Sequence, residues 1–229
     1  MALSVLAASC SSPWNREPVA KEVNFAFTMD GNLMRLDTVR LDNRPGRFLL
    51  GTAAPQSIVD PQFPLRRSFG RHVIQISEKQ TLRIQPAQHD LRGVADAIIG
   101  SEAWGSNAIS IDYRSGLVTY QKDGIRDGLM NIYRYDAAPK INVMVDGRAI
   151  SAIVDTTSPD TLVLPGPSSE RRNATVTIGS TDFGTIDVQY ANVAQARIGN
   201  RLLSHFLVTI DYGQRVVGLW RDPRTPLAP

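Results

Sequence analysis

An internal duplication constrains the fold of this chain more than any other feature. Residues 39–61 align with residues 143–165 without a gap at an offset of 104. Seven of the 23 positions are identical: Val39/Val143, Asp42/Asp146, Arg44/Arg148, Thr52/Thr156, Pro55/Pro159, Val59/Val163 and Pro61/Pro165. A second block, residues 96–120, aligns with residues 195–219 at an offset of 99 and pairs Gly100 with Gly199. Two blocks repeated in the same order predict two similar lobes around a pseudo-twofold axis.

Both copies have the composition of β-strands. Short runs rich in β-branched and aromatic residues alternate with turn residues, which is typical of strands, and only residues 202–206 favour a helical turn. We expect strands at residues 48–50, 56–59, 108–113, 117–120, 152–154, 161–164, 175–178, 207–211 and 216–220. The sequence therefore predicts an all-β protein with little helix. Its lobes should span residues 23–123 and 140–222, joined by a connection at 124–139 and followed by a tail at 223–229.

Composition excludes several function classes. The chain has 229 residues, 42% of them hydrophobic, which is enough for real cores. Its 25 basic and 22 acidic residues are interleaved along the chain, which argues against nucleic-acid binding. The chain has one cysteine, and its three histidines, His72, His89 and His205, lack the spacing of a zinc site. We expect no metal and no cofactor.

The N-terminus has a short apolar stretch that ends in small residues directly before Cys10. This pattern resembles the lipobox of bacterial lipoproteins. The resemblance implies that Cys10 is lipidated, that residues 1–22 are a signal-like segment and tether, and that a lipid anchor is the chain's only membrane attachment. The alternative is a disordered N-terminus with an incidental cysteine.

The repeated blocks resemble the two signatures of retropepsin-like and pepsin-like aspartic proteases. Residues 152–159 read Ala-Ile-Val-Asp-Thr-Thr-Ser-Pro, similar to the apolar run into Asp-Thr-Gly that forms the catalytic turn of that family. Residues 196–206 and 207–220 are similar to its second signature, an apolar run with glycine, a short helix and two strands, and residues 97–120 repeat it. The resemblance implies a bilobal fold made of two retropepsin-sized β lobes.

The resemblance also implies a defect in the catalytic pair. These enzymes use two carboxylates, one from each lobe, that share a proton. Asp155 is the retained member, but the gap-free alignment places Gly51 at the first-lobe position. Glycine can neither accept nor donate a proton from a side chain. Losing one member of a coupled catalytic pair removes most of what the other supplies.

The residues after these two positions show one retained and one altered feature. Thr52 and Thr156 occupy the family position whose hydroxyl crosses to the opposite lobe, so we expect the lobe interface to persist. The glycine that follows in the family is replaced by Ala53 and Thr157, so we expect rebuilt turns. The middle of each half should supply a hairpin over the cleft, at residues 73–76 with 81–85 and at 175–178 with 185–190. An ordinary hairpin packed on its own lobe is the alternative.

Three functions are consistent with these features. The leading interpretation is a degenerate aspartic-protease-like protein of the bacterial cell envelope, facing the periplasm, that binds a peptide or protein segment between its lobes. The second is an active aspartic endopeptidase that uses Asp155 with another carboxylate or with a second chain; Asp42 and Asp60 are the first-half candidates, and neither is expected to reach Asp155. The third is a structural envelope module. Function depends on the site rather than on the fold.

Overall fold

A computed structural model describes residues 22–67, 70–121, 131–167, 169–225 and 227 of the chain. The first half of the described chain holds β1 (Glu22–Asp30), β2 (Leu33–Leu36), β3 (Arg40–Leu41), β4 (Arg44–Pro45), β5 (Phe48–Leu50), β6 (Ile58–Val59), β7 (His72–Gln75), β8 (Thr81–Ile84), β9 (Ala87–Gln88), β10 (Ala97–Ile99), the 3-10 helix η1 (Ser101–Ala103), β11 (Ala108–Asp112) and β12 (Leu117–Gln121). The second half holds β13 (Asn131–Arg134), β14 (Lys140–Val145), β15 (Arg148–Val154), β16 (Leu162–Pro165), β17 (Glu170–Ile178), β18 (Thr181–Ala191), β19 (Ala196–Ile198), α1 (Asn200–Leu203), β20 (Leu207–Asp211) and β21 (Val216–Trp220). The prediction of an all-β chain with little helix is confirmed.

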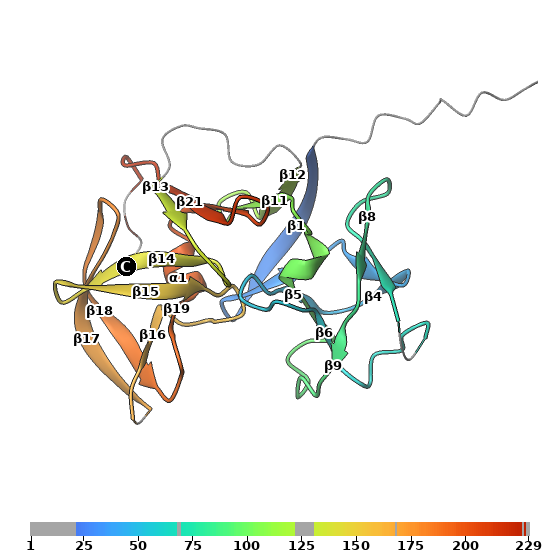
Figure 1. Ribbon diagram of the computed structural model, residues 1–229, viewed down its shortest axis with the longest axis horizontal. Coiled ribbons are helices and arrows are strands. Elements are labelled where there is room, and N and C mark those ends of the chain that lie inside the picture. The colour runs from blue at the N-terminus through green and yellow to red at the C-terminus, as the bar shows by residue number, and fades with distance from the viewer. Residues whose placement is uncertain (1–21, 68–69, 122–130, 168, 226, 228–229) are drawn as a thin grey trace, which may run out of the picture.

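The strands form three assemblies. An 11-stranded sheet runs in the order β13-β21-β20-β11-β12-β1-β2-β5-β10-β6-β9, and β4-β3-β7-β8 form a smaller sheet. Strands β14-β15-β19-β16-β18-β17 close into a barrel. Figure 1 shows the barrel on one side, the strands β4–β9 on the other, and β11, β12, β20 and β21 between them. The long sheet is therefore built from both halves of the chain.

The register at the centre of this sheet reflects the duplication. β11 pairs antiparallel with β20, and Ser110 lies opposite Thr209, which is its equivalent at the offset of 99. Their hydroxyl oxygens lie 2.8 Å apart. An antiparallel pair of equivalent strands is related by a local twofold rotation through the residues that face their own counterparts. The pseudo-twofold relation between the copies therefore passes through Ser110 and Thr209.

The alignment of the two copies did not predict β1 and β13, which lie at equivalent places in the sheet. β1 pairs with β12, and β13 pairs in the same way with β21. β13 lies within the segment predicted as a connection, residues 124–139, of which 124–130 fall outside the described residues. In β1 the buried residues alternate with exposed ones, and Phe25 stacks on Trp104 with ring centroids 6.0 Å apart. One continuous cluster of buried apolar side chains extends through both halves.

Both hairpins predicted in the middle of each half are present. β7 and β8 form the first and β17 and β18 the second. The second hairpin belongs to the barrel, because β17 also pairs with β14 and β18 with β16. Over Glu170–Ala174, however, β17 pairs only with β18, and β8 pairs only with β7. Each half thus has a stretch of strand with one edge free of other described strands.

Within the described ranges, no helix has the length and apolar character needed to cross a membrane.

Candidate functional site

The site predicted from the sequence consists of two turns, one in each half. In the first, the Gly51 N–H donates to the Ile99 carbonyl at 2.9 Å and the Ala54 N–H donates to the Gly51 carbonyl at 3.3 Å. In the second, the Asp155 N–H donates to the Ile198 carbonyl at 3.0 Å and the Ser158 N–H to the Asp155 carbonyl at 3.1 Å. The donors and acceptors of the first turn are the repeat equivalents of those in the second turn: Ile99 corresponds to Ile198, and Ala54 corresponds to Ser158. The two turns therefore have the same backbone frame, and Gly51 occupies the place of Asp155.

Two threonines join the turns to each other. The Thr52 hydroxyl donates to the Val154 carbonyl at 2.6 Å, and the Thr156 hydroxyl donates to the Leu50 carbonyl at 2.5 Å. Each hydroxyl also accepts the backbone N–H of the other threonine at 3.2 Å. Both threonines are fully buried. This reciprocal set of hydrogen bonds places the two turns against one another, as expected from the family position of Thr52 and Thr156.

Asp155 is buried, and both of its carboxylate oxygens are occupied. Oδ1 accepts the Thr157 N–H at 3.0 Å and the Thr157 hydroxyl at 2.6 Å. Oδ2 accepts Nη1 of Arg197 at 3.0 Å. The Asp155 side chain is 2% exposed, whereas the Arg197 side chain is 47% exposed. These three donors use most of the acceptor positions of the carboxylate, and burial leaves it little contact with solvent.

The Gly51 position lacks space for a second carboxylate. A Cβ atom added to Gly51 would overlap Cγ2 of Ile98 and would lie 3.3 Å from Cβ of Ala54. Ile98 stands in β10 at the repeat equivalent of Arg197 in β19. In the first half, the Ile98 side chain therefore occupies the space beside Gly51. In the second half, Arg197 forms an ion pair with Asp155 at the equivalent place.

The other first-half carboxylates serve local turns. Oδ1 of Asp60 accepts the Gln62 N–H at 2.9 Å and Oδ2 accepts the Leu91 N–H at 2.8 Å, which holds the pKa of Asp60 below its usual value. Neither oxygen contacts Asp155. The structure thus agrees with the expectation that Asp60 does not reach the second turn.

Asp42 is engaged in the first hairpin region. Its carboxylate accepts the N–H groups of Val73 and Arg66, each at 3.1 Å, and lies 2.7 Å from Nδ1 of His72. Partial burial acts to raise the pKa of Asp42, but the hydrogen bonds from His72 and the backbone outweigh it and leave the pKa below its usual value. Asp42 is therefore a structural acceptor and does not pair with Asp155.

Three residues of this region were not recognised in the sequence. Ile98 and Arg197 could have been found, because the offset of 99 aligns them directly before the matched pair Ile99/Ile198. Asn200 carries no such signal. Its side-chain nitrogen donates to the carbonyls of Asn32 and Thr156 at 2.7 and 2.8 Å, and its oxygen accepts the Tyr113 hydroxyl at 2.8 Å. Burial raises the pKa of Tyr113, so its hydroxyl stays protonated and donates.

The remaining residues predicted for the site are Ala53, Thr157 and Cys10. Ala53 and Thr157 are partly exposed and follow the two threonines in the turns, and Thr157 is used by Asp155 as described above. The predicted lipidation residue, Cys10, lies outside the described residues. Among the described residues, no three His, Cys, Asp or Glu side chains gather where they could hold a metal ion.

The two turns do not present two facing carboxylates. The exposed guanidinium of Arg197 and the partly exposed Ile98 lie at equivalent places beside the two turns. No protein-family model matches this chain, and a search of the curated proteins finds no match either.

Proposed function

We propose that this protein is a non-catalytic, bilobal relative of the retropepsin-like aspartic proteases, and that it binds an extended peptide segment between its two halves. One observation carries the loss of catalysis: Asp155 is hydrogen-bonded by Thr157 and ion-paired with Arg197, while the space beside Gly51 is filled by Ile98. An aspartic protease activates water with two carboxylates that share a proton. This site has one carboxylate, and its charge is already paired.

The geometry also disfavours an intermolecular catalytic pair. Two chains could bring their Asp155 residues together only if their second turns faced each other. Thr156 and Thr52 of one chain already exchange two N–H to hydroxyl hydrogen bonds, and their hydroxyls donate to the carbonyls of Leu50 and Val154, all buried. A dimer of second halves would have to break these bonds and leave buried polar groups without partners, which is costly.

Peptide binding is supported by the two free strand edges. β8 is followed directly by Gln85, whose carbonyl accepts a hydrogen bond from the side chain of Gln56, five residues after Gly51. The free part of β17 contains Arg171, which forms an ion pair with Asp160, five residues after Asp155. A contact therefore links each free edge to one of the turns. The turn-side residues of these contacts, Gln56 and Asp160, are equivalent in the repeat. Extended peptides commonly bind by adding a strand to such an edge.

Cleavage assays test the loss of catalysis. A diverse peptide library should be incubated with wild type and with Asp155→Asn between about pH 3 and 7, because two carboxylates sharing a proton titrate in this range. We expect no cleavage by either protein. Cleavage by wild type that disappears in Asp155→Asn and is blocked by a transition-state inhibitor of aspartic proteases would show that a second carboxylate operates, and the proposal would be wrong.

Binding assays test the peptide site separately. Peptides captured by wild type from the same library should be compared with versions that are N-methylated at alternate residues, which removes the N–H groups needed for strand addition. We expect N-methylation to abolish binding. Retention of binding after N-methylation would reject strand addition as the mode of recognition.

We also propose that Cys10 carries a lipid anchor and that the protein faces the periplasm. The apolar stretch and small residues before Cys10 support this proposal. Intact-mass measurement of the membrane fraction from bacterial cells should give the mass of a chain that begins at a diacylated Cys10. A soluble, unmodified chain that still begins at Met1 would contradict it.

A further inference from the structure

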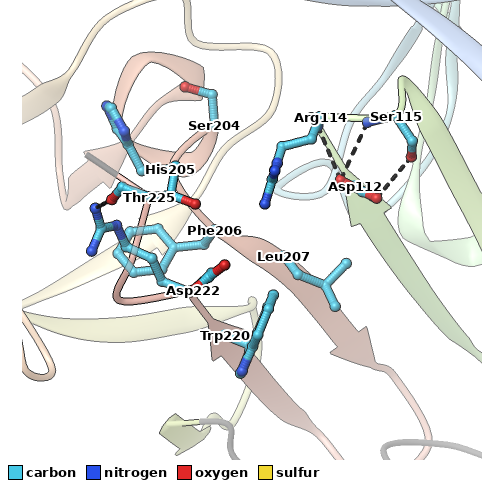
Figure 2. Close-up of a pocket in the computed structure, with 11 residues that line it drawn as sticks. Asp112, Arg114, Ser115, Ser204, His205, Phe206, Leu207, Trp220, Asp222 and Thr225 are labelled. Carbon is cyan, nitrogen blue, oxygen red and sulfur yellow. Dashed lines mark hydrogen bonds between the residues drawn. The ribbon is translucent and has the colours of Figure 1, made fainter. Parts of the chain in front are cut away.

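A cavity of about 560 Å³ lies on the outer face of the long sheet, away from the two turns. Its floor includes Asp112, Leu207 and Trp220, which are neighbours in one row across β11, β20 and β21. Arg114 enters from the turn between β11 and β12, and His205 and Phe206 follow α1. Figure 2 shows these side chains around a common space. The volume is within the range of small-molecule sites.

The duplicated half supplies a natural comparison for this cavity. The equivalent row across β20, β11 and β12 is Asp211, Ala108 and Gln121, and both Asp211 and Ala108 are buried. Gln121 donates a hydrogen bond to Ser110 at 2.8 Å. The equivalent of Arg114 is Gly213, where an added Cβ would overlap the Ser106 carbonyl. The backbone frame is closely packed at Ala108, Asp211 and Gly213 in one copy, whereas the equivalent positions line a cavity in the other; residues 122 and 123, the counterparts of Arg221 and Asp222, lie outside the described residues.

The side chains that differ between the copies give the cavity its chemistry. Glycine, serine, asparagine, alanine and glutamine in the packed copy correspond to Arg114, His205, Phe206, Leu207 and Trp220 in the open one. Phe206, Leu207 and Trp220 offer apolar and aromatic surface. Burial, and then the nearby Arg221, lower the pKa of His205, so this side chain is neutral at pH 7. Arg221 is itself bonded to the Thr225 carbonyl.

Two opposite charges line the cavity without pairing. Arg114 contributes a guanidinium and Asp222 a carboxylate, and Figure 2 shows both pointing toward the same space. Within the described part of the chain they form no ion pair, and Asp222 accepts only the Arg224 N–H through one oxygen, at 2.9 Å. Asp112 is already bonded to Ser115 and to the Arg114 backbone. Arg114, whose guanidinium forms no hydrogen bond or ion pair with the described residues, and Asp222, with one carboxylate oxygen unused by them, are therefore the charged groups best able to bind a ligand. Arg221 adds a second cation to the lining.

We propose that this cavity binds a small zwitterion with an apolar side chain, either a free amino acid or a dipeptide. Its carboxylate would bind Arg114 through the planar fork that suits carboxylates, and its ammonium group would bind Asp222. Its side chain would pack against Phe206, Leu207 and Trp220. This site is separate from the peptide site proposed above, so the two proposals fail or succeed independently.

Calorimetric titration of the full chain with a matched set of probes tests the proposal. L-phenylalanine and glycyl-L-phenylalanine carry both charges and distinguish the two sources of the zwitterion. 3-Phenylpropanoate carries only the carboxylate, and 2-phenylethylamine carries only the ammonium group. We expect wild type to bind at least one of the two zwitterions, and to bind it more tightly than either single-charge probe.

Variants assign each charge. Arg114→Gln should weaken the zwitterion and 3-phenylpropanoate about tenfold to a hundredfold, and leave 2-phenylethylamine unchanged. Asp222→Asn, which keeps an acceptor for the Arg224 N–H, should weaken the zwitterion and the amine and leave 3-phenylpropanoate unchanged. Trp220→Gln, which copies the packed half, should weaken all probes. The control Arg148→Gln, at the exposed start of β15, should change none of them.

Two outcomes would overturn the proposal. The first is the absence of saturable binding of both zwitterions by wild type. The second is equal weakening of all probes by Arg114→Gln and Asp222→Asn while thermal unfolding shows both variants folded, because charge-specific recognition requires opposite probe preferences.

Discussion

The turn at Gly51 and the turn at Asp155 have the same backbone and different chemistry. Equivalent hydrogen bonds form in both, and Thr52 and Thr156 exchange identical contacts across the pseudo-twofold relation. The side chains diverge at two equivalent places, where glycine and isoleucine in one half face aspartate and arginine in the other. Ile98 fills the space beside Gly51, and Arg197 neutralises the charge of Asp155.

This difference teaches that the shared backbone of the two turns does not depend on whether the first turn residue is glycine or aspartate. The buried threonine hydrogen bonds and the strand pairing hold the turns in place, so the aspartate position can change while the fold remains. Removing one charge of a buried pair is costly, whereas replacing both members by well-packed apolar groups is often neutral. Gly51 and Ile98 are such a replacement for the pair formed by Asp155 and Arg197.

The largest expected effect comes from breaking the shared frame. Thr52→Val should destabilise the protein by about 2–4 kcal/mol, because it leaves the Thr156 N–H and the Val154 carbonyl buried without partners. Thr156→Val should cost a similar amount, since its contacts are equivalent. Urea unfolding measures both. The control Thr119→Val, whose hydroxyl bonds the exposed Asn24 side chain, should change stability by less than about 0.5 kcal/mol. Clearly unequal losses for the two variants would mean that the two turns are not energetically equivalent.

A smaller effect is expected from making the second turn resemble the first. Arg197→Ile alone should cost about 1–3 kcal/mol, because Asp155 loses its counter-charge while the exposed half of the arginine limits the loss. Asp155→Gly combined with Arg197→Ile should recover at least half of that loss in urea unfolding. If the double variant is as unstable as the single one, the pair is not exchangeable for the arrangement in the first half.

The smallest effect on stability is expected from substitutions of Asp42 and Asp146, which occupy equivalent turns in the two halves. Asp42 accepts three donors, whereas the equivalent Asp146 accepts the Thr175 N–H at 2.8 Å. Both residues have positive φ, which asparagine tolerates. At pH 7, Asp42→Asn should cost about 1–2 kcal/mol and Asp146→Asn less than about 0.5 kcal/mol, because one acceptor oxygen suffices for a single donor.

The pH dependence of the same pair provides a second measurement. The folded-state pKa of Asp42 is lowered, so the stability that its charge contributes is present above the ordinary value of 3.8 and is lost as the pH falls through the folded-state pKa. The difference between wild type and Asp42→Asn should therefore narrow below about pH 4 in urea unfolding. A difference that stays constant down to pH 3 would contradict this role of the charge.

Much of the architecture could be predicted because the two copies share identical residues at fixed offsets. The two offsets establish the equivalence of Gly51 with Asp155 and of Thr52 with Thr156. The runs of β-branched and aromatic residues predict the strands of both blocks, and the contact between the two threonines is expected from the family resemblance. β1 and β13 could not be predicted in this way, because their equivalence rests on pairing with β12 and β21 and not on shared residues. A strand at the side of a sheet needs only alternating buried positions, and many sequences satisfy this requirement.

The sequence by itself determined that the chain is an all-β protein with an internal duplication, and that an aspartate in one copy stands where the other copy has a glycine. Only the tertiary structure decided how that aspartate is used, because Arg197 lies 42 residues away and reaches Asp155 through the parallel pairing of β15 with β19. The cavity beside Arg114 and Trp220 is also a tertiary property. Its walls come from separate segments, and whether equivalent segments pack tightly or leave a cavity depends on side-chain volumes that meet only in the folded chain.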